Sequence, residues 1–144
     1  MAKPKIKVKG VTYWHPYLSC ISSKAKIGEG TIIHAGVHIH DEVKIGKHCK
    51  IQAQVFIPNG VTIEDNVFVW PQVGFANDAK MIGFSANFKP EPTLIKRGAK
   101  IGMGAKINAG LTIGENAIIG MGSVVLDNCE AGGTYVGSPA RRIK

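Results

Sequence analysis

Aliphatic residues return every six positions along most of the chain. One run of ten hexads begins at Ile21 and ends with the hexad of Phe75, and a second run extends from Ile95 to Val125. Four residues after these positions stands a small or β-branched residue, beginning with Ala25, and Leu111 is the exception. Neither an α-helix nor an ordinary amphipathic strand has a period of six. The pattern instead indicates short strands that alternate with tight corners.

The sixteen hexads predict an all-β solenoid. If three strands and three corners close one triangular coil, equivalent residues stack eighteen apart in parallel strands about 4.8 Å from one another. The large aliphatic side chains then fill the interior, and the small residues occupy the narrow inner corners. Gly, Asn and Asp at the intervening positions, as in Gly28-Glu29-Gly30, suit turns with positive φ. We predict one β-helix domain of about five coils over residues 1–144.

Three segments depart from the repeat. Residues 1–14 form a lead-in, residues 130–144 form a C-terminal tail, and residues 80–94 interrupt the hexads. An insertion into a solenoid projects as a loop from one corner. This loop contains two Phe and a Met, which are apolar side chains that need something to cover them. A tolerated surface insertion is the alternative to a functional arm.

Charge and composition narrow the class of partner. The net charge is +8, which suggests an anionic partner. The lysines are spread singly through the repeats, so the sequence does not favour nucleic acid. The phosphates of a small cofactor explain the charge as well as a larger anion does. The basic N-terminus lacks the apolar segment of a signal peptide, and no stretch is long enough to span a membrane. Three widely spaced cysteines suit a reducing compartment. We therefore expect a cytoplasmic protein with no membrane partner.

Two kinds of segment carry a family resemblance. The stretch 92–102, followed by Gly120-Met121-Gly122 and by Gly137-Ser138-Pro139-Ala140-Arg141, resembles the coenzyme A-binding half of the hexapeptide-repeat acyltransferases. The likeness covers residues 15 to 143. It implies a left-handed parallel β-helix, a homotrimer with sites between subunits, and a loop that closes a neighbouring site. The handedness follows from the resemblance alone, since crossover connections are normally right-handed.

The segment 61–69, which leads to Phe75-Ala76-Asn77-Asp78, is similar to the nucleotide-sugar N-acetyltransferases. The resemblance implies transfer of an acetyl group from acetyl-coenzyme A to the amine of a UDP- or dTDP-linked amino sugar. It points to Asn77 as the residue that orients the amine or the acetyl group. Asp78 is expected to hold a substrate hydroxyl or to take up charge.

The same resemblance suggests cofactor contacts. Backbone at Met103 and Met121, eighteen residues apart, is expected to contact the pantetheine arm. Pro139 is expected near the adenine, and Arg141 and Lys144 near the phosphates. A solvated basic tail is the alternative explanation for the two cations.

Stacking eighteen apart suggests further substrate contacts. Asn59 should lie directly below Asn77 in a ladder that begins at Asp41, and an asparagine ladder is often purely structural. His34 should stack below Gln52 and Trp70, and Gln54 should lie below Gln72. Together with Gln72, His34 and Trp70 form a polar and aromatic column that could receive a nucleotide base. Burial of Trp70 beneath the loop is the alternative.

Two other classes of function stay open. His34, His38 and His40 invite comparison with the zinc-binding γ-class carbonic anhydrases, but the expected coil separates His34 from His40, and we expect no metal. A non-catalytic β-helix scaffold is the second alternative. Pro71 is followed by Gln72, which cannot act as a general base, so an amine is a more suitable acceptor than a hydroxyl.

Overall fold

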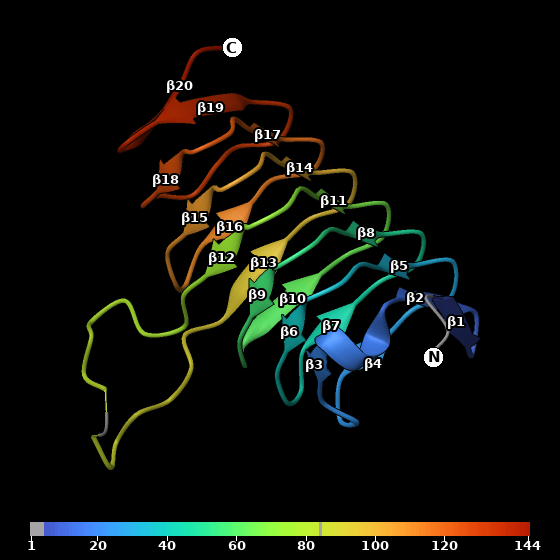
Figure 1. The fold of residues 1–144 in the computed structure, drawn as a ribbon. Coiled ribbons are helices and arrows are strands. Elements are labelled where there is room, and N and C mark those ends of the chain that lie inside the picture. Colours follow the sequence, from blue (N-terminus) through green and yellow to red (C-terminus); the bar gives the residue numbers. More distant parts are fainter. Residues whose placement is uncertain (1–4, 84) are drawn as a thin grey trace.

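The computed structural model describes residues 5–83 and 85–144. Three sheets wrap around a common axis (Figure 1), and together they contain the twenty strands of the described residues. The described residues also form one 3-10 turn, η1 (Pro16–Leu18). The nine-stranded sheet contains, in spatial order, β1 (Lys5–Val8), β2 (Val11–Trp14), β5 (Ile32–Ile33), β8 (Lys50–Ile51), β11 (Phe68–Val69), β14 (Lys100–Ile101), β17 (Ile118–Ile119), β19 (Thr134–Gly137) and β20 (Ala140–Arg142).

The other two sheets complete the triangular cross-section. The six-stranded sheet contains β3 (Cys20–Ile21), β6 (His38–Ile39), β9 (Phe56–Ile57), β12 (Gly74–Phe75), β15 (Lys106–Ile107) and β18 (Val124–Val125). The five-stranded sheet contains β4 (Lys26–Ile27), β7 (Lys44–Ile45), β10 (Val61–Ile63), β13 (Thr93–Ile95) and β16 (Thr112–Ile113). The chain visits the three sheets in turn, so consecutive strands lie on different sides of the prism.

The register confirms the stacking rule. Ile33 pairs with Ile51, and Ile51 pairs with Val69, always eighteen residues apart in parallel strands. The architecture is the predicted left-handed parallel β-helix. The strands from β3 to β18 are only two or three residues long. The last residue of each points inward, and the corner that follows leads the chain to the next side of the prism.

The core is the interior of this prism. The large apolar residue of each hexad is buried from Ile33 to Val125. The inner-corner residues are buried as well, as at Val37, Val55 and Ala105, except Ala79 and Leu111, which are half-buried. One continuous apolar column therefore runs along the axis, and each coil stabilises only its neighbours.

The structure corrects the predicted extent of the repeat. The helix has about seven turns rather than about five, because β2 and β19 add parallel strands at the two ends of the nine-stranded sheet. The lead-in and the tail fold back as antiparallel strands β1 and β20. The interruption ends earlier than residue 94, since Thr93 and Leu94 belong to β13 and pair with Val61 and Thr62.

The loop between β12 and β13 projects from the prism beside β12, as Figure 1 shows. Its insertion lengthens the stacking interval, so Gly74 pairs with Lys106 in the next coil. No helix among residues 5–83 and 85–144 is long and apolar enough to cross a membrane.

Replacing Ile101 with alanine tests how much one core position contributes to the stability of the fold. Ile101 is fully buried and lies between Val69 and Ile119. We expect the free energy of unfolding to fall by roughly 2–5 kcal/mol, because the substitution removes buried methyl groups and leaves a cavity. Urea unfolding at fixed protein concentration measures the change. The exposed neighbour Lys100 supplies a control, and Lys100→Ala should stay within about 0.5 kcal/mol of wild type. Equal effects of the two variants would contradict this core.

Candidate functional site

Two corners of the prism carry the predicted site residues. The first corner is the turn from the nine-stranded to the six-stranded sheet, and the second corner is the turn from the six-stranded to the five-stranded sheet. The predicted residues of the first corner are His34, Trp70, Gln72, Met103 and Met121, and those of the second corner are Asn59, Asn77 and Asp78. The outer face of the six-stranded sheet separates the two groups within one chain.

Aromatic and amide side chains stack at the first corner. The Trp70 ring lies on the Phe68 ring with 3.7 Å between centroids and an angle of 27° between planes. The Lys50 ammonium lies 5.1 Å from the Phe68 centroid. One coil apart, Gln72 Nε2 donates a hydrogen bond of 3.2 Å to Gln54 Oε1. The predicted glutamine stack is present, and Trp70 is half-buried against Phe68.

His34 lies two coils below Trp70 on the same corner, in register with Gln52 between them. Its ring is nearly parallel to that of Trp14, with 6.5 Å between centroids. Its Nε2 is buried and has no hydrogen-bond partner among the described residues. Burial lowers the pKa of His34 below 6.5, and the nearby Lys50 ammonium lowers this pKa further.

This lowered pKa predicts a pH dependence of stability. Above about pH 6.5 the imidazole is neutral in both the folded and the unfolded chain. As the pH falls below that value, the unfolded chain binds a proton before the folded chain does, so the free energy of unfolding decreases. We expect the melting temperature of His34→Gln to decrease less between pH 7 and pH 5 than that of the wild type. Parallel curves for the two proteins would show that His34 does not carry this effect.

At the second corner, Asn77 and Asp78 hold the base of the loop. Asn77 Nδ2 donates to the Asn59 carbonyl at 3.1 Å, and the Asn77 carbonyl accepts from the Glu91 amide at 3.0 Å. The Asp78 carboxylate accepts from the amides of Ile82 and Gly83 at 3.1 and 2.9 Å. The predicted contact between Asn77 and Asn59 is present, and both ends of the loop are tied to Asn77.

A hollow of about 380 Å³ lies on the six-stranded sheet between the two corners. Its floor lacks large side chains because Gly74 and Ala76 occupy the outward positions of that coil, and Met81 of the loop borders it. Lys106 is the one charged residue among the described residues that line it. Its Nζ donates a 2.7 Å hydrogen bond to the Gln72 carbonyl at the first corner.

Sequence reasoning missed both the hollow and Lys106. The insertion places Lys106 above Gly74 at an interval of 32 residues, so counting by eighteen cannot pair them. The sequence feature that could have indicated the hollow is Gly74, the one glycine in the outward strand positions of the six-stranded sheet.

The predicted cofactor residues lie beside this hollow and above it, toward the C-terminal end. The Gly122 amide donates to the Met103 carbonyl at 2.8 Å, so Met103 and Met121 stack as expected, and both side chains are exposed. Pro139 lies in the turn between β19 and β20, the strand pair that ends the nine-stranded sheet. Arg141 lies 3.9 Å from Asp127 and is exposed, as is the terminal Lys144. These five residues therefore lie in the three coil levels at the C-terminal end.

Residues 24–59 and 92–127, together half of the chain, match the family described as "Bacterial transferase hexapeptide (six repeats)". The chain belongs to this family.

The two segments of this chain that match the family lie on either side of the loop in the sequence. Asn59 lies in the first segment and Met103 and Met121 in the second, whereas Asn77 and Asp78 lie between the two.

Curated relatives resemble parts of the chain. It is 37% identical over 98 residues to "Bifunctional protein GlmU" of Thermodesulfovibrio yellowstonii, an alignment that covers 65% of this chain and 21% of that protein. It is 47% identical over 60 residues to a UDP-3-O-acylglucosamine N-acyltransferase of Methylobacterium nodulans, which covers 42% and 17% respectively. The chain thus spans about a fifth of the length of these relatives.

A solved structure shares the fold over nearly the whole chain. It is a point mutant of AntD, an N-acyltransferase from Bacillus cereus, in complex with dTDP and coenzyme A. The TM-score is 0.82 at 22% identity, and the match covers 93% of this chain and 80% of that one.

The histidines do not gather on one face of this family member. His34 lies at the first corner, whereas His38 and His40 lie around Phe56, with centroids 6.5 and 5.0 Å from that ring. Across the described ranges, no three His, Cys, Asp or Glu side chains are placed to hold a metal ion.

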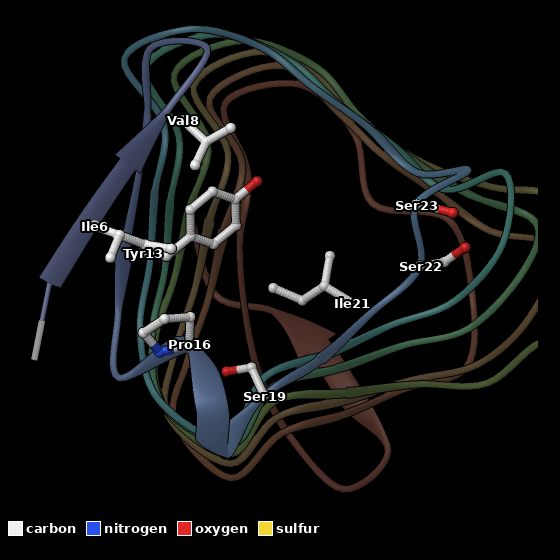
Figure 2. Close-up of a pocket in the computed structure, with 8 residues that line it drawn as sticks. All are labelled: Ile6, Val8, Tyr13, Pro16, Ser19, Ile21, Ser22 and Ser23. Carbon is white, nitrogen blue, oxygen red and sulfur yellow. The ribbon is translucent and has the colours of Figure 1, made fainter. Parts of the chain in front are cut away.

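A second hollow, of about 340 Å³, lies at the N-terminal end of the prism (Figure 2). Tyr13 and Ile21 point into the triangular opening there. None of the predicted site residues lines it.

Proposed function

We propose that the chain transfers an acetyl group from acetyl-coenzyme A to the amino group of a UDP- or dTDP-linked amino sugar. The observation that carries the proposal is the hollow on the six-stranded sheet. Stacked backbone at Met103 and Met121 leads to it from one corner. At the other corner, the polar pair Asn77 and Asp78 lies in the chain between Ala76 and Ala79, which both line the hollow. Acyl transfer needs this arrangement, a track for a long cofactor arm that ends beside groups able to orient an amine.

The activities named for two similar proteins support the same chemistry. One is an N-acyltransferase named for a UDP-linked sugar, and another binds both dTDP and coenzyme A. The cofactor enters from the C-terminal end, where Pro139, Arg141 and Lys144 receive its adenine and phosphates. The nucleotide enters from the opposite direction along the first corner, where Trp70, Gln72 and His34 form the stack for its base.

We also propose that the protein is a homotrimer with sites between subunits. Exposed apolar side chains surround the hollow, including Phe56, Leu126 and Met81, which are 40%, 47% and 89% exposed. Such side chains favour cover by a partner surface. A neighbouring subunit would close the hollow and bring its own corner toward the loop. We place the protein in the cytoplasm, in keeping with its three unpaired cysteines, Cys20, Cys49 and Cys129.

In this mechanism Asn77 orients the amine, and Asp78 holds a sugar hydroxyl while it maintains the loop. The amine attacks the thioester carbonyl, and the thiolate leaves. An amine needs little general-base assistance, so its proton passes to solvent, to Asp78 or to the departing thiolate. The glutamine at position 72 fits this route because it takes no part in proton transfer.

Thermal denaturation with separate ligands tests the class of function. Ligands that bind only the folded protein raise its melting temperature. We expect increases with acetyl-coenzyme A and with either UDP or dTDP, and none with zinc. No increase with acetyl-coenzyme A at any concentration would contradict the proposed transferase. A saturable stabilisation by zinc alone would favour the metal-binding alternative.

A further inference from the structure

Lys106 occupies a distinctive place in the hollow. It extends from β15 over Gly74, and a Cβ added at Gly74 would lie 3.4 Å from Lys106 Cδ. The hydrogen bond to the Gln72 carbonyl fixes its ammonium at the first corner, below the stacked methionines. An ammonium has three N–H donors, and this bond uses one of them. Two donors stay available to an acceptor in the hollow.

The cofactor track of the proposed function ends beside this ammonium. Arg141 lies on β20, two strand positions above β17, the strand that leads to Met121. Met121 lies one coil above Met103, and the Gly104 amide donates to the Pro71 carbonyl one coil lower. Four strand spacings of about 4.8 Å separate β20 from β11, so Gln72, which follows β11, lies roughly 19 Å below the level of Arg141. A pantetheine arm that descends this corner from the phosphates brings its thioester to the level of Gln72 and Lys106.

We propose that the Lys106 ammonium donates a hydrogen bond to the thioester oxygen and stabilises the negative charge that forms there. This inference rests on the proposed function. The amine nitrogen forms a bond to the carbonyl carbon, and the π electron pair moves to the oxygen, which becomes an oxyanion held by Lys106. When the C–O double bond re-forms, the C–S bond breaks, the thiolate departs with its electron pair, and the nitrogen loses one proton.

The surroundings of Lys106 suit this role. Its neighbours in the hollow include Val124, Leu126 and Met81, and no other described residue that lines it is charged. A cation stabilises a developing oxyanion more strongly in an apolar, water-poor site than in water. The ammonium is exposed in the single chain, and the neighbouring subunit of the proposed trimer would exclude water from it. Gly74 leaves the space in which the thioester can reach it.

Steady-state kinetics of three variants test the proposal. Lys106→Met keeps the length and apolar stem of the side chain but removes the donor, and we expect kcat to fall about 10²-fold with little change in KM for acetyl-coenzyme A. Lys106→Arg should restore part of kcat. Lys100→Met, a variant of an exposed lysine at the same strand position in the nine-stranded sheet, should match wild type.

The outcomes separate the two proposals. If wild type transfers acetyl groups and Lys106→Met keeps its kcat, the assignment of Lys106 is wrong while the proposed function stands. An increase in KM alone would assign Lys106 to binding of an anionic group and would also overturn its role toward the oxyanion. A wild type that binds acetyl-coenzyme A but acetylates no amine under any condition overturns the proposed function itself. Melting temperatures of the variants within a few degrees of wild type confirm that each one is folded.

Discussion

The Asn77→Ala variant is expected to lose about 10²–10³-fold in kcat, because it removes a polar group positioned toward the reacting amine. Asn77 Nδ2 is held by the Asn59 carbonyl, which fixes the amide plane. Within the described part of the chain, Asn77 Oδ1 accepts no hydrogen bond, so it can accept one from the amine. Initial rates over a range of amino-sugar and acetyl-coenzyme A concentrations measure the loss.

Asn77 also stabilises the loop base, so a structural role must be separated from a chemical one. Its side-chain hydrogen bond contributes about 0.5–1.5 kcal/mol, which denaturant unfolding can measure. Asn87→Ala makes the same change at an exposed position of the same loop and should leave kcat unaltered. A folded Asn77→Ala protein with wild-type kcat would remove Asn77 from the mechanism.

Gly102→Ala is expected to weaken both the fold and the binding of acetyl-coenzyme A. A Cβ on Gly102 would lie 2.6 Å from the Met121 nitrogen and 2.7 Å from the Ile119 carbonyl oxygen. These are backbone atoms, so β14 and β17 must move apart to make room for a methyl group. We expect a loss of about 1–3 kcal/mol in the free energy of unfolding. KM for acetyl-coenzyme A should rise, because Met103 and Met121 move apart.

Gly74→Ala supplies the matched control for stability. Its added Cβ would meet only the flexible Lys106 side chain at 3.4 Å, and Gly74 does not have positive φ. Urea unfolding should place this variant within about 0.5 kcal/mol of wild type. Equal destabilisation by the two substitutions would show that close backbone approach at Gly102 is not the cause.

The sequence predicted the interior of the fold more completely than its ends. The hexads locate most of the inward-facing aliphatic residues, because only a large apolar residue fills the prism at that position. The ends escape the pattern. Tyr13 replaces the aliphatic at one end and Tyr135 at the other, yet their strands pair with Ile33 and Ile119 and extend the helix to about seven turns.

The candidate site was predictable only where stacking is regular. Counting by eighteen correctly pairs Asn59 with Asn77, Gln54 with Gln72, and Met103 with Met121. It fails across the insertion, where the loop changes the interval and conceals Lys106 above Gly74.

Direct observation of acetyl transfer tests the central claim. Purified protein is incubated with acetyl-coenzyme A and a panel of UDP- and dTDP-linked amino sugars, and products are identified by mass spectrometry while free thiol is measured. We predict that one amino sugar gains an acetyl group on nitrogen in equal amount to the thiol released. If thiol release never exceeds that of the cofactor alone and no sugar gains mass, the protein is not the transferase proposed.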